Sequence, residues 1–196
     1  MPDAHTADKI LDLAQSLNAA GQLFHVDGTS RHPHLTIFMS QFATTNIDSY
    51  LDHLNRLSIE GPVHASAFGL TLSANGYLEI GYNKSTILES LQRRVAEVAN
   101  GLWTPSGDPE ESGASELENR YERTAGYKLF GDLYRPHITL AAYARVPELT
   151  LPPLRDFRAF DFRFDELVVG RTDQYGSVIA VIDRIPLRSK RFGYGP

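Results

Sequence analysis

Apolar residues repeat at three- and four-residue intervals in several stretches of the chain, as expected for helices with one buried face. We expect Thr6 to cap the first helix, and residues 45–48 and 86–89 have the form of capping boxes that open two more. Helices are therefore predicted over residues 6–20, 45–57, 86–100 and 115–124.

Apolar and β-branched runs separated by turn residues predict the strands. The pair Asn75-Gly76 and the segment Asp173-Gln174-Tyr175-Gly176 each indicate a hairpin between two such runs. The order of helices and strands has no βαβαβ alternation, so we predict an α+β fold with antiparallel sheets. The predicted strands cover residues 22–26, 35–42, 63–73, 77–82, 137–143, 160–172 and 177–187.

Composition narrows the class of protein. The chain has 196 residues, 42% of them hydrophobic, which is enough for one core or for two small lobes. Its net charge of −5 disfavours wrapping of long nucleic acid, which depends on neutralising many phosphates. The absence of cysteine excludes disulfides, thiolate catalysis and Cys-ligated metals. We find no stretch apolar enough to cross a bilayer, and we expect a cytoplasmic monomer without membrane partners.

One short motif occurs twice. Pro33-His34-Leu35-Thr36-Ile37 recurs as Pro136-His137-Ile138-Thr139-Leu140. On a strand, residues i and i+2 project from the same face, so each copy is expected to present an imidazole beside a hydroxyl. A single copy is most simply explained as β-branched packing around a satisfied histidine, but the repetition favours a functional pair.

Two histidines and two threonines suit phosphoryl chemistry. Displacement at phosphorus needs a base for the attacking group and an acid for the leaving group, and two imidazoles can fill both roles near neutral pH. Threonine hydroxyls can donate hydrogen bonds to the non-bridging oxygens. The catalytic candidates are therefore His34, His137, Thr36 and Thr139, with no metal or other cofactor required.

At these two motifs the sequence resembles the 2H phosphoesterase superfamily, which includes 2′-5′ RNA ligase-like proteins and cyclic nucleotide phosphodiesterases. The resemblance covers roughly residues 22–187 and implies a bilobal, internally duplicated α+β fold with helices on the outer faces and an active-site cleft between the lobes. It implies motif lobes around 22–103 and 115–187 and allows elements to be exchanged between them. The predicted helix at 1–21 departs from the family pattern as an N-terminal extension, and residues 188–196 are expected to form a C-terminal tail. The loop 104–114 is the candidate lobe boundary.

The resemblance also implies a substrate class. The expected activity is metal-independent cleavage of a 2′,3′-cyclic phosphate or a 2′-5′ phosphodiester, on an RNA end or a small nucleotide. Aromatic and basic residues near the motifs are candidates for holding the base or a phosphate. These substrate-binding candidates are Arg135, Tyr134, Phe38, Phe130 and Tyr82, with Arg31 as a further basic residue.

Two alternatives remain open from the residues. His32 and His34 form an H-x-H pair that, with His25 or an acidic residue, would suit a metallohydrolase. That interpretation leaves the His137 copy of the motif unexplained. The other alternative is a catalytically silent module that binds nucleotides or RNA ends on the same fold.

Overall fold

The computed structural model describes residues 1–17, 21–104, 114–146 and 156–189. The chain folds into two compact units, and each unit is assembled from separate stretches of sequence. Unit 1 comprises Met1–Leu35, Glu60–Asn83 and Pro136–Pro196, and unit 2 comprises Thr36–Ile59 and Lys84–Arg135. Both motif histidines thus belong to unit 1, whereas the sequence led us to expect one motif in each lobe.

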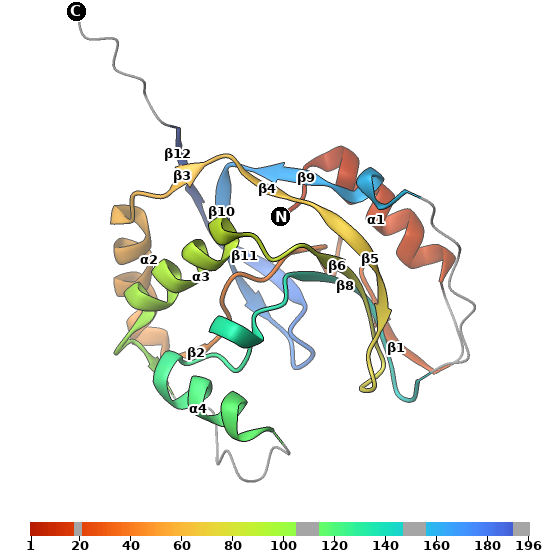
Figure 1. Cartoon of the computed structure of the whole chain (residues 1–196). Coiled ribbons are helices and arrows are strands. Elements are labelled where there is room, and N and C mark those ends of the chain that lie inside the picture. The colour runs from red at the N-terminus through yellow and green to blue at the C-terminus, as the bar shows by residue number, and fades with distance from the viewer. Residues whose placement is uncertain (18–20, 105–113, 147–155, 190–196) are drawn as a thin grey trace, which may run out of the picture. The chain divides into compact units, whose positions relative to one another are not determined.

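An antiparallel four-stranded sheet forms the centre of unit 1 (Figure 1). Its apolar core includes Leu78, Ile80, Ile138 and Leu140, each fully buried. Helix α1 (Ala4–Ser16) packs against β8 through a face that includes Ile10, so it is an integral part of this unit. The strands, in spatial order, are β1 (Gln22–His25), β8 (His137–Tyr143), β6 (Tyr77–Tyr82) and β5 (Ala67–Leu72).

Shorter strand pairs complete unit 1. The predicted C-terminal hairpin is present as β10 (Glu166–Thr172) and β11 (Val178–Pro186), joined by the expected turn. The segment before it contains the short 3-10 helix η4 (Phe157–Phe160). The remaining pairs are β4 (Val63–Ala65) with β9 (Phe162–Phe164), and β3 (Glu60–Gly61) with β12 (Arg188–Ser189).

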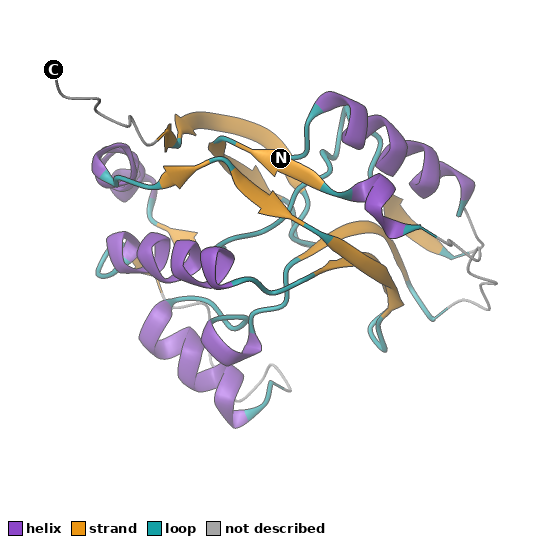
Figure 2. Cartoon of the chain, turned by 45° about the horizontal axis from the view of Figure 1, so that its top comes forward, coloured by secondary structure: helices purple, strands orange, loops and turns teal. Residues whose placement is uncertain are grey.

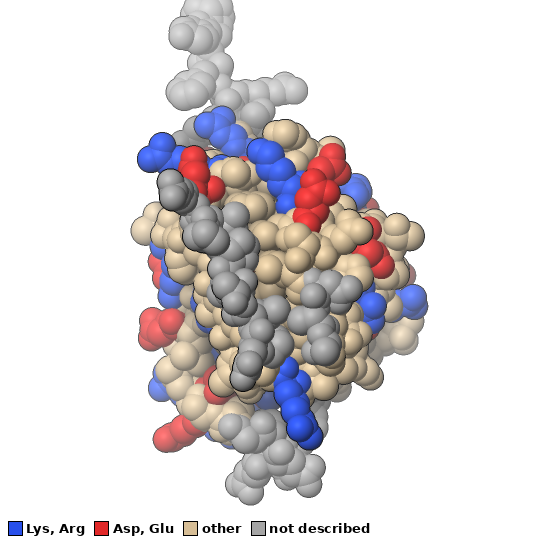
Figure 3. All heavy atoms as spheres, turned by 90° about the vertical axis from the view of Figure 1, so that its right-hand side faces the viewer, with Lys and Arg blue, Asp and Glu red and all other residues tan. Residues whose placement is uncertain are grey.

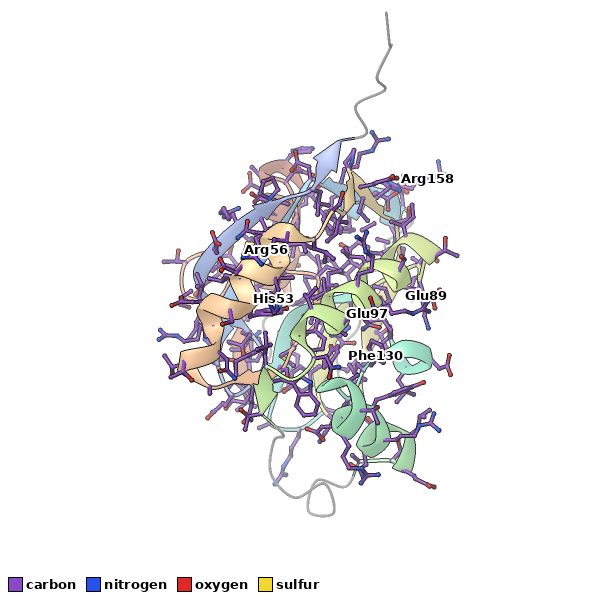
Figure 4. All side chains as sticks on the ribbon, turned by 90° about the vertical axis from the view of Figure 1, so that its left-hand side faces the viewer. His53, Arg56, Glu89, Glu97, Phe130 and Arg158 are labelled. Atoms are coloured by element: carbon purple, nitrogen blue, oxygen red, sulfur yellow. The ribbon has the colours of Figure 1, made fainter. Side chains whose placement is uncertain are left out.

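Unit 2 is mainly helical (Figure 2). Helices α2 (Ile47–Arg56) and α3 (Thr86–Ala99) are neighbours, and Nδ1 of His53 lies 3.5 Å from the carbonyl oxygen of Val98. Figure 4 labels His53 on α2 and Glu97 on α3. The other elements are η1 (Thr44–Asn46), α4 (Glu116–Ala125), η3 (Gly131–Leu133) and the pair β2 (Gln41–Phe42) with β7 (Trp103–Thr104).

The predicted helices are present, but most of their caps differ. Asp3 rather than Thr6 caps α1, because its side chain accepts a hydrogen bond from the Thr6 N–H. Ser85 caps α3 one residue before the box predicted at 86–89. No side chain caps α2, because a 3-10 turn leads directly into it. Helix α4 has a complete capping box between Ser115 and Glu118.

The strand predicted over 35–42 is wrong for most of its length. Only Gln41–Phe42 forms a strand, and residues 35–40 have no ladder partner. The physical reason is that the chain passes from unit 1 to unit 2 after Leu35, so its apolar residues are divided between two cores. The predicted proline-rich segment at 146–154 and the boundary loop at 104–114 lie almost wholly outside the described residues.

The turn between β5 and β6 provides a test of this fold. Gly76 has a positive φ of +79°, and a Cβ atom there would lie 2.5 Å from the Tyr143 carbonyl oxygen. We expect Gly76→Ala to cost about 1–2 kcal/mol for the left-handed backbone and about 1–3 kcal/mol more for displacing β8. Urea denaturation measures both costs together.

Gly21 supplies the matched control for this substitution. It has the same φ, but no described atom lies within 4 Å of the position its Cβ would take. Gly21→Ala should therefore show only the backbone cost. Equal losses of stability in the two variants would contradict the packing described for the turn and β8.

Candidate active site

The second motif lies on β8 as the sequence predicts. His137 and Thr139 share one face of the strand and are partly exposed, whereas Ile138 and Leu140 between them are fully buried. The alternation places an imidazole and a hydroxyl side by side on the face of the sheet that is turned away from the core. The local prediction for this motif is confirmed.

A buried carboxylate accompanies this motif. Glu79 on β6 pairs with Thr139 on β8, and its Oε1 atom lies 3.4 Å from Nε2 of His137. The Glu79 side chain is only 5% exposed and that of His137 19%. The sequence analysis missed Glu79, although an acidic residue in the middle of an apolar strand is a recognisable signal.

The first motif has a different local structure. His34 does not lie on a strand. His32, two residues earlier, forms an isolated bridge with Val178, and its backbone N–H donates a hydrogen bond to the Val178 carbonyl oxygen, with the nitrogen 3.0 Å from that oxygen. Nδ1 of His34 lies 2.9 Å from the carbonyl oxygen of His32. Because a carbonyl only accepts, Nδ1 carries the hydrogen in this contact, and Nε2 is the unprotonated nitrogen when the ring is neutral.

Burial is the main cause that lowers the pKa of His34. The positive charges of His137 and of the amino terminus lower it further, while hydrogen bonds with the backbone at His32 and Gly176 oppose the shift. Both motif histidines belong to unit 1, and His137 is close enough to His34 to act on its pKa. His34 is therefore favoured in its neutral form at neutral pH.

The segment before His34 is attached to the β10–β11 turn. Nε of Arg31 lies 3.0 Å from Oδ2 of Asp173, and its guanidinium lies 4.9 Å above the Phe24 ring. Asp173 also accepts hydrogen bonds from the backbone N–H groups of Tyr175 and Ser177. The Arg31 side chain, considered for phosphate binding, is therefore engaged in holding this segment in place.

All the other sequence candidates except Tyr82 lie in unit 2. Thr36 begins that unit, and its carbonyl accepts a hydrogen bond from the buried Tyr134 hydroxyl at 3.3 Å. Phe38 contacts Tyr127 edge to face, with ring centroids 5.8 Å apart. Phe130, labelled in Figure 4, packs in the same manner on Tyr121 at 5.6 Å. Arg135 is exposed.

Two of the aromatic candidates are buried. Tyr82 is 1% exposed and donates its hydroxyl hydrogen to the Phe160 carbonyl, and Tyr134 is 3% exposed. Burial raises the pKa of both hydroxyls. These rings belong to the cores of their units and have no surface to offer a nucleobase.

A different aromatic residue lies next to the second motif. Phe68 on β5 is 58% exposed, and its ring covers Gly81, where a Cβ atom would lie 2.5 Å from the Phe68 Cζ. Gly81 is the direct partner of His137 across the β6–β8 ladder, so the Phe68 ring lies on the face that carries His137. The sequence analysis did not select Phe68, because its proximity depends on strand register.

The described residues also bear on the other classes of function. No three His, Cys, Asp or Glu side chains among them converge so as to hold a metal ion. None of the described helices combines the length and the apolar character that a membrane span needs. On the face shown in Figure 3, acidic and basic side chains are interspersed, and much of the described surface between them is uncharged.

The coupling between the histidines gives a direct prediction. Replacing His137 by Asn removes one positive charge near His34, so the pKa of His34 should rise toward 6.5 while staying below it, because burial remains. An NMR pH titration of the imidazole measures this shift. His53→Asn on the exposed surface of α2 should leave the His34 titration unchanged. An unaltered His34 titration in His137→Asn would contradict the proximity of the two rings.

Comparison with solved structures places this geometry in a known fold. The chain is similar to TT0787 from Thermus thermophilus, with a TM-score of 0.64 and 20% identity over 97% of this chain and 95% of that one. It is also similar to E. coli LigT in complex with 3′-AMP, with a TM-score of 0.59 and 14% identity over 95% and 94% of the two chains. A structure described as a phosphoesterase matches with a TM-score of 0.50 and 15% identity over 91% of each chain.

A scan against protein-family models found no match, and a search among curated proteins found none either. The structural likenesses nevertheless extend over more than nine-tenths of every chain compared. The protein therefore has the α+β fold of LigT and of the phosphoesterase, and the α+β class implied by its resemblance to the 2H phosphoesterases is confirmed.

Proposed function

We propose that this protein is a phosphodiesterase of the 2H type that works without a metal ion. Its substrates are 2′,3′-cyclic phosphate or 2′-5′ phosphodiester groups, on RNA ends or small nucleotides. The observation that carries the proposal is the pair of neighbouring histidines in unit 1, each taken from one copy of the repeated motif. Their surroundings differ, as acid–base catalysis requires.

In this proposal one imidazole takes a proton from the attacking water and the other gives a proton to the leaving oxygen. The hydroxyls of Thr36 and Thr139 donate hydrogen bonds to the non-bridging phosphate oxygens, where negative charge increases in the transition state. Thr139 projects beside His137 from the same strand face. Thr36 follows His34 by two residues, at the start of unit 2.

Three features support a nucleotide as the substrate. The exposed Phe68 ring next to the partner of His137 offers a surface on which a base can stack. Exposed Arg135, directly before the second motif, is our candidate for a phosphate contact. LigT, which shares the fold, was crystallised with 3′-AMP and with NADP+.

Substitution of the four motif residues tests the mechanism. We expect His34→Ala and His137→Ala each to lower turnover at least about 10²-fold, the low end for a general acid or base. Thr36→Ala and Thr139→Ala should cost about 10-fold or more each, because other donors remain. The double histidine variant should be little worse than the worse single one, since the pair acts as a unit. Turnover of nucleoside 2′,3′-cyclic phosphates and 2′-5′ dinucleotides provides the measurement.

The control for these variants is His53→Ala, which removes an exposed imidazole in unit 2 and should keep full turnover. Near wild-type turnover in either motif histidine variant would reject the two-histidine mechanism. Tight nucleotide binding by the wild type without turnover of any substrate would favour the binding module instead.

Metal removal distinguishes this mechanism from the metallohydrolase alternative. Since two imidazoles supply both proton transfers, we expect EDTA dialysis to leave turnover within about twofold of the untreated enzyme. The assay compares the dialysed protein with samples given Zn²⁺ or Mn²⁺. Loss of activity on dialysis and its recovery with either ion would point to the His32 and His34 pair as metal ligands.

A further inference from the structure

The two motif histidines are equivalent in sequence, so the motif alone does not tell which is the acid and which is the base. Their surroundings are not equivalent. Among the described residues, no carboxylate forms an ion pair with His34, whereas Glu79 lies 3.4 Å from Nε2 of His137. Within the described part of the chain, a carboxylate thus lies beside only one of the two imidazoles.

The position of Glu79 is costly for a residue with no role. It is 4% exposed in a strand whose neighbours Leu78 and Ile80 are fully buried. Burying a carboxylate is unfavourable unless a positive or hydrogen-bonding partner compensates for the lost water. The cationic form of His137 is such a partner, because the pair then has no net charge in a poorly hydrated place.

The sheet fixes this pair. Glu79 is opposite Thr139, and His137 is opposite Gly81, so the carboxylate and the imidazole lie diagonally across two hydrogen-bonded strands. On the other side of β6, exposed Thr71 is the residue opposite Glu79. The distance between carboxylate and ring is therefore set by backbone pairing and not by a loop.

The other titratable groups near Glu79 do not cancel its attraction for the His137 imidazolium. Burial is the main cause that raises the pKa of the Tyr77 hydroxyl, and the nearby Asp173, Tyr175 and Glu79 raise it further. The hydroxyl of Tyr77, which lies on β6, therefore stays neutral. His34 contributes charge only when it is protonated, and its pKa is lowered. On β1, the neighbouring strand, His25 is opposite Ala141, farther along β8. The face of α1 buried in unit 1 consists of Thr6, Ile10, Leu13 and Ala14.

We propose that Glu79 is a positioning residue whose carboxylate pairs with the His137 imidazolium, so that His137 is the general acid and His34 is the general base. This assignment rests on the proposed function. Nε2 of His34 removes a proton from water as the water oxygen bonds to phosphorus. The bond from phosphorus to the leaving oxygen breaks, and the His137 imidazolium gives its proton to that oxygen. Solvent then returns the proton from His34 to His137, so the net reaction adds one water across the P–O bond.

The leaving group provides the test. A ribose alkoxide needs a proton when it departs, whereas a 4-nitrophenolate does not, so loss of the general acid matters less for a 4-nitrophenyl ester. We would measure kcat and KM for a dinucleotide and for a nucleoside 4-nitrophenyl phosphate. The variants are Glu79→Gln, His137→Ala and His34→Ala. Glu97→Gln makes the same charge change at an exposed position on α3 and serves as control (Figure 4).

We expect Glu79→Gln to lower kcat for the dinucleotide at least about 10-fold with little change in KM, a part of the full contribution of a general acid. On the nitrophenyl ester, the kcat of Glu79→Gln should stay within about threefold of the wild type. The decrease in kcat caused by His137→Ala should likewise be smaller on this ester than on the dinucleotide. His34→Ala should lose equally on both substrates, and Glu97→Gln should match the wild type.

Other outcomes have distinct meanings. Equal losses for Glu79→Gln on both substrates, or relief in His34→Ala in place of His137→Ala, would overturn the assignment while leaving the two-histidine mechanism intact. Full activity in both histidine variants would instead reject the proposed function. If Glu79→Gln does not fold, Glu79→Asp keeps the charge on a shorter side chain. The kcat of Glu79→Asp should then fall only for the dinucleotide. An equal fall in kcat on both substrates would also refute the proposal.

Discussion

The pairing of β6 with β8 is the constraint on which the candidate site depends. This ladder aligns His137 with Gly81 and Thr139 with Glu79, and it buries Ile80 and Ile138 on the opposite face. A shift of one residue in this register would exchange the two faces of β8 and send both motif side chains into the core. The same apolar packing that stabilises the sheet therefore determines which side chains are available for chemistry.

The two histidines are held by different means. His137 is part of a regular strand, whereas His34 lies outside any strand and follows a segment held by the His32 bridge to Val178 and by the Arg31–Asp173 ion pair. One ring is thus placed by a sheet and the other by a hairpin turn that contacts it through backbone groups. The repeated motif does not require a repeated backbone structure, and this difference gives the imidazoles unequal electrostatic surroundings.

Much of this could be predicted from the chain alone. Periodicity located the four α-helices, the strand of His137 and the final hairpin, because each has a continuous apolar pattern. The apolar run after His34 was misinterpreted as one strand because a pattern does not reveal that its residues belong to two cores. Tyr82 and Tyr134 were chosen for their ring type, yet burial decides whether a ring can meet a ligand. Glu79 carried a signal as an acidic residue in an apolar strand, but strand register was needed to place Glu79 and Phe68 next to the second motif.

The interleaved course of the chain has a consequence for how the protein acquires its structure. Strand β1 is an edge strand whose only neighbour in the four-stranded sheet is β8, and β8 also joins it to the β5–β6 hairpin. During synthesis, the first strand must wait until His137–Tyr143 has left the ribosome before the sheet can close. Such long-range contacts slow folding and leave strand edges exposed in the meantime. The edges of β1 thus stay without their partner in this sheet until the segment that carries the second histidine arrives.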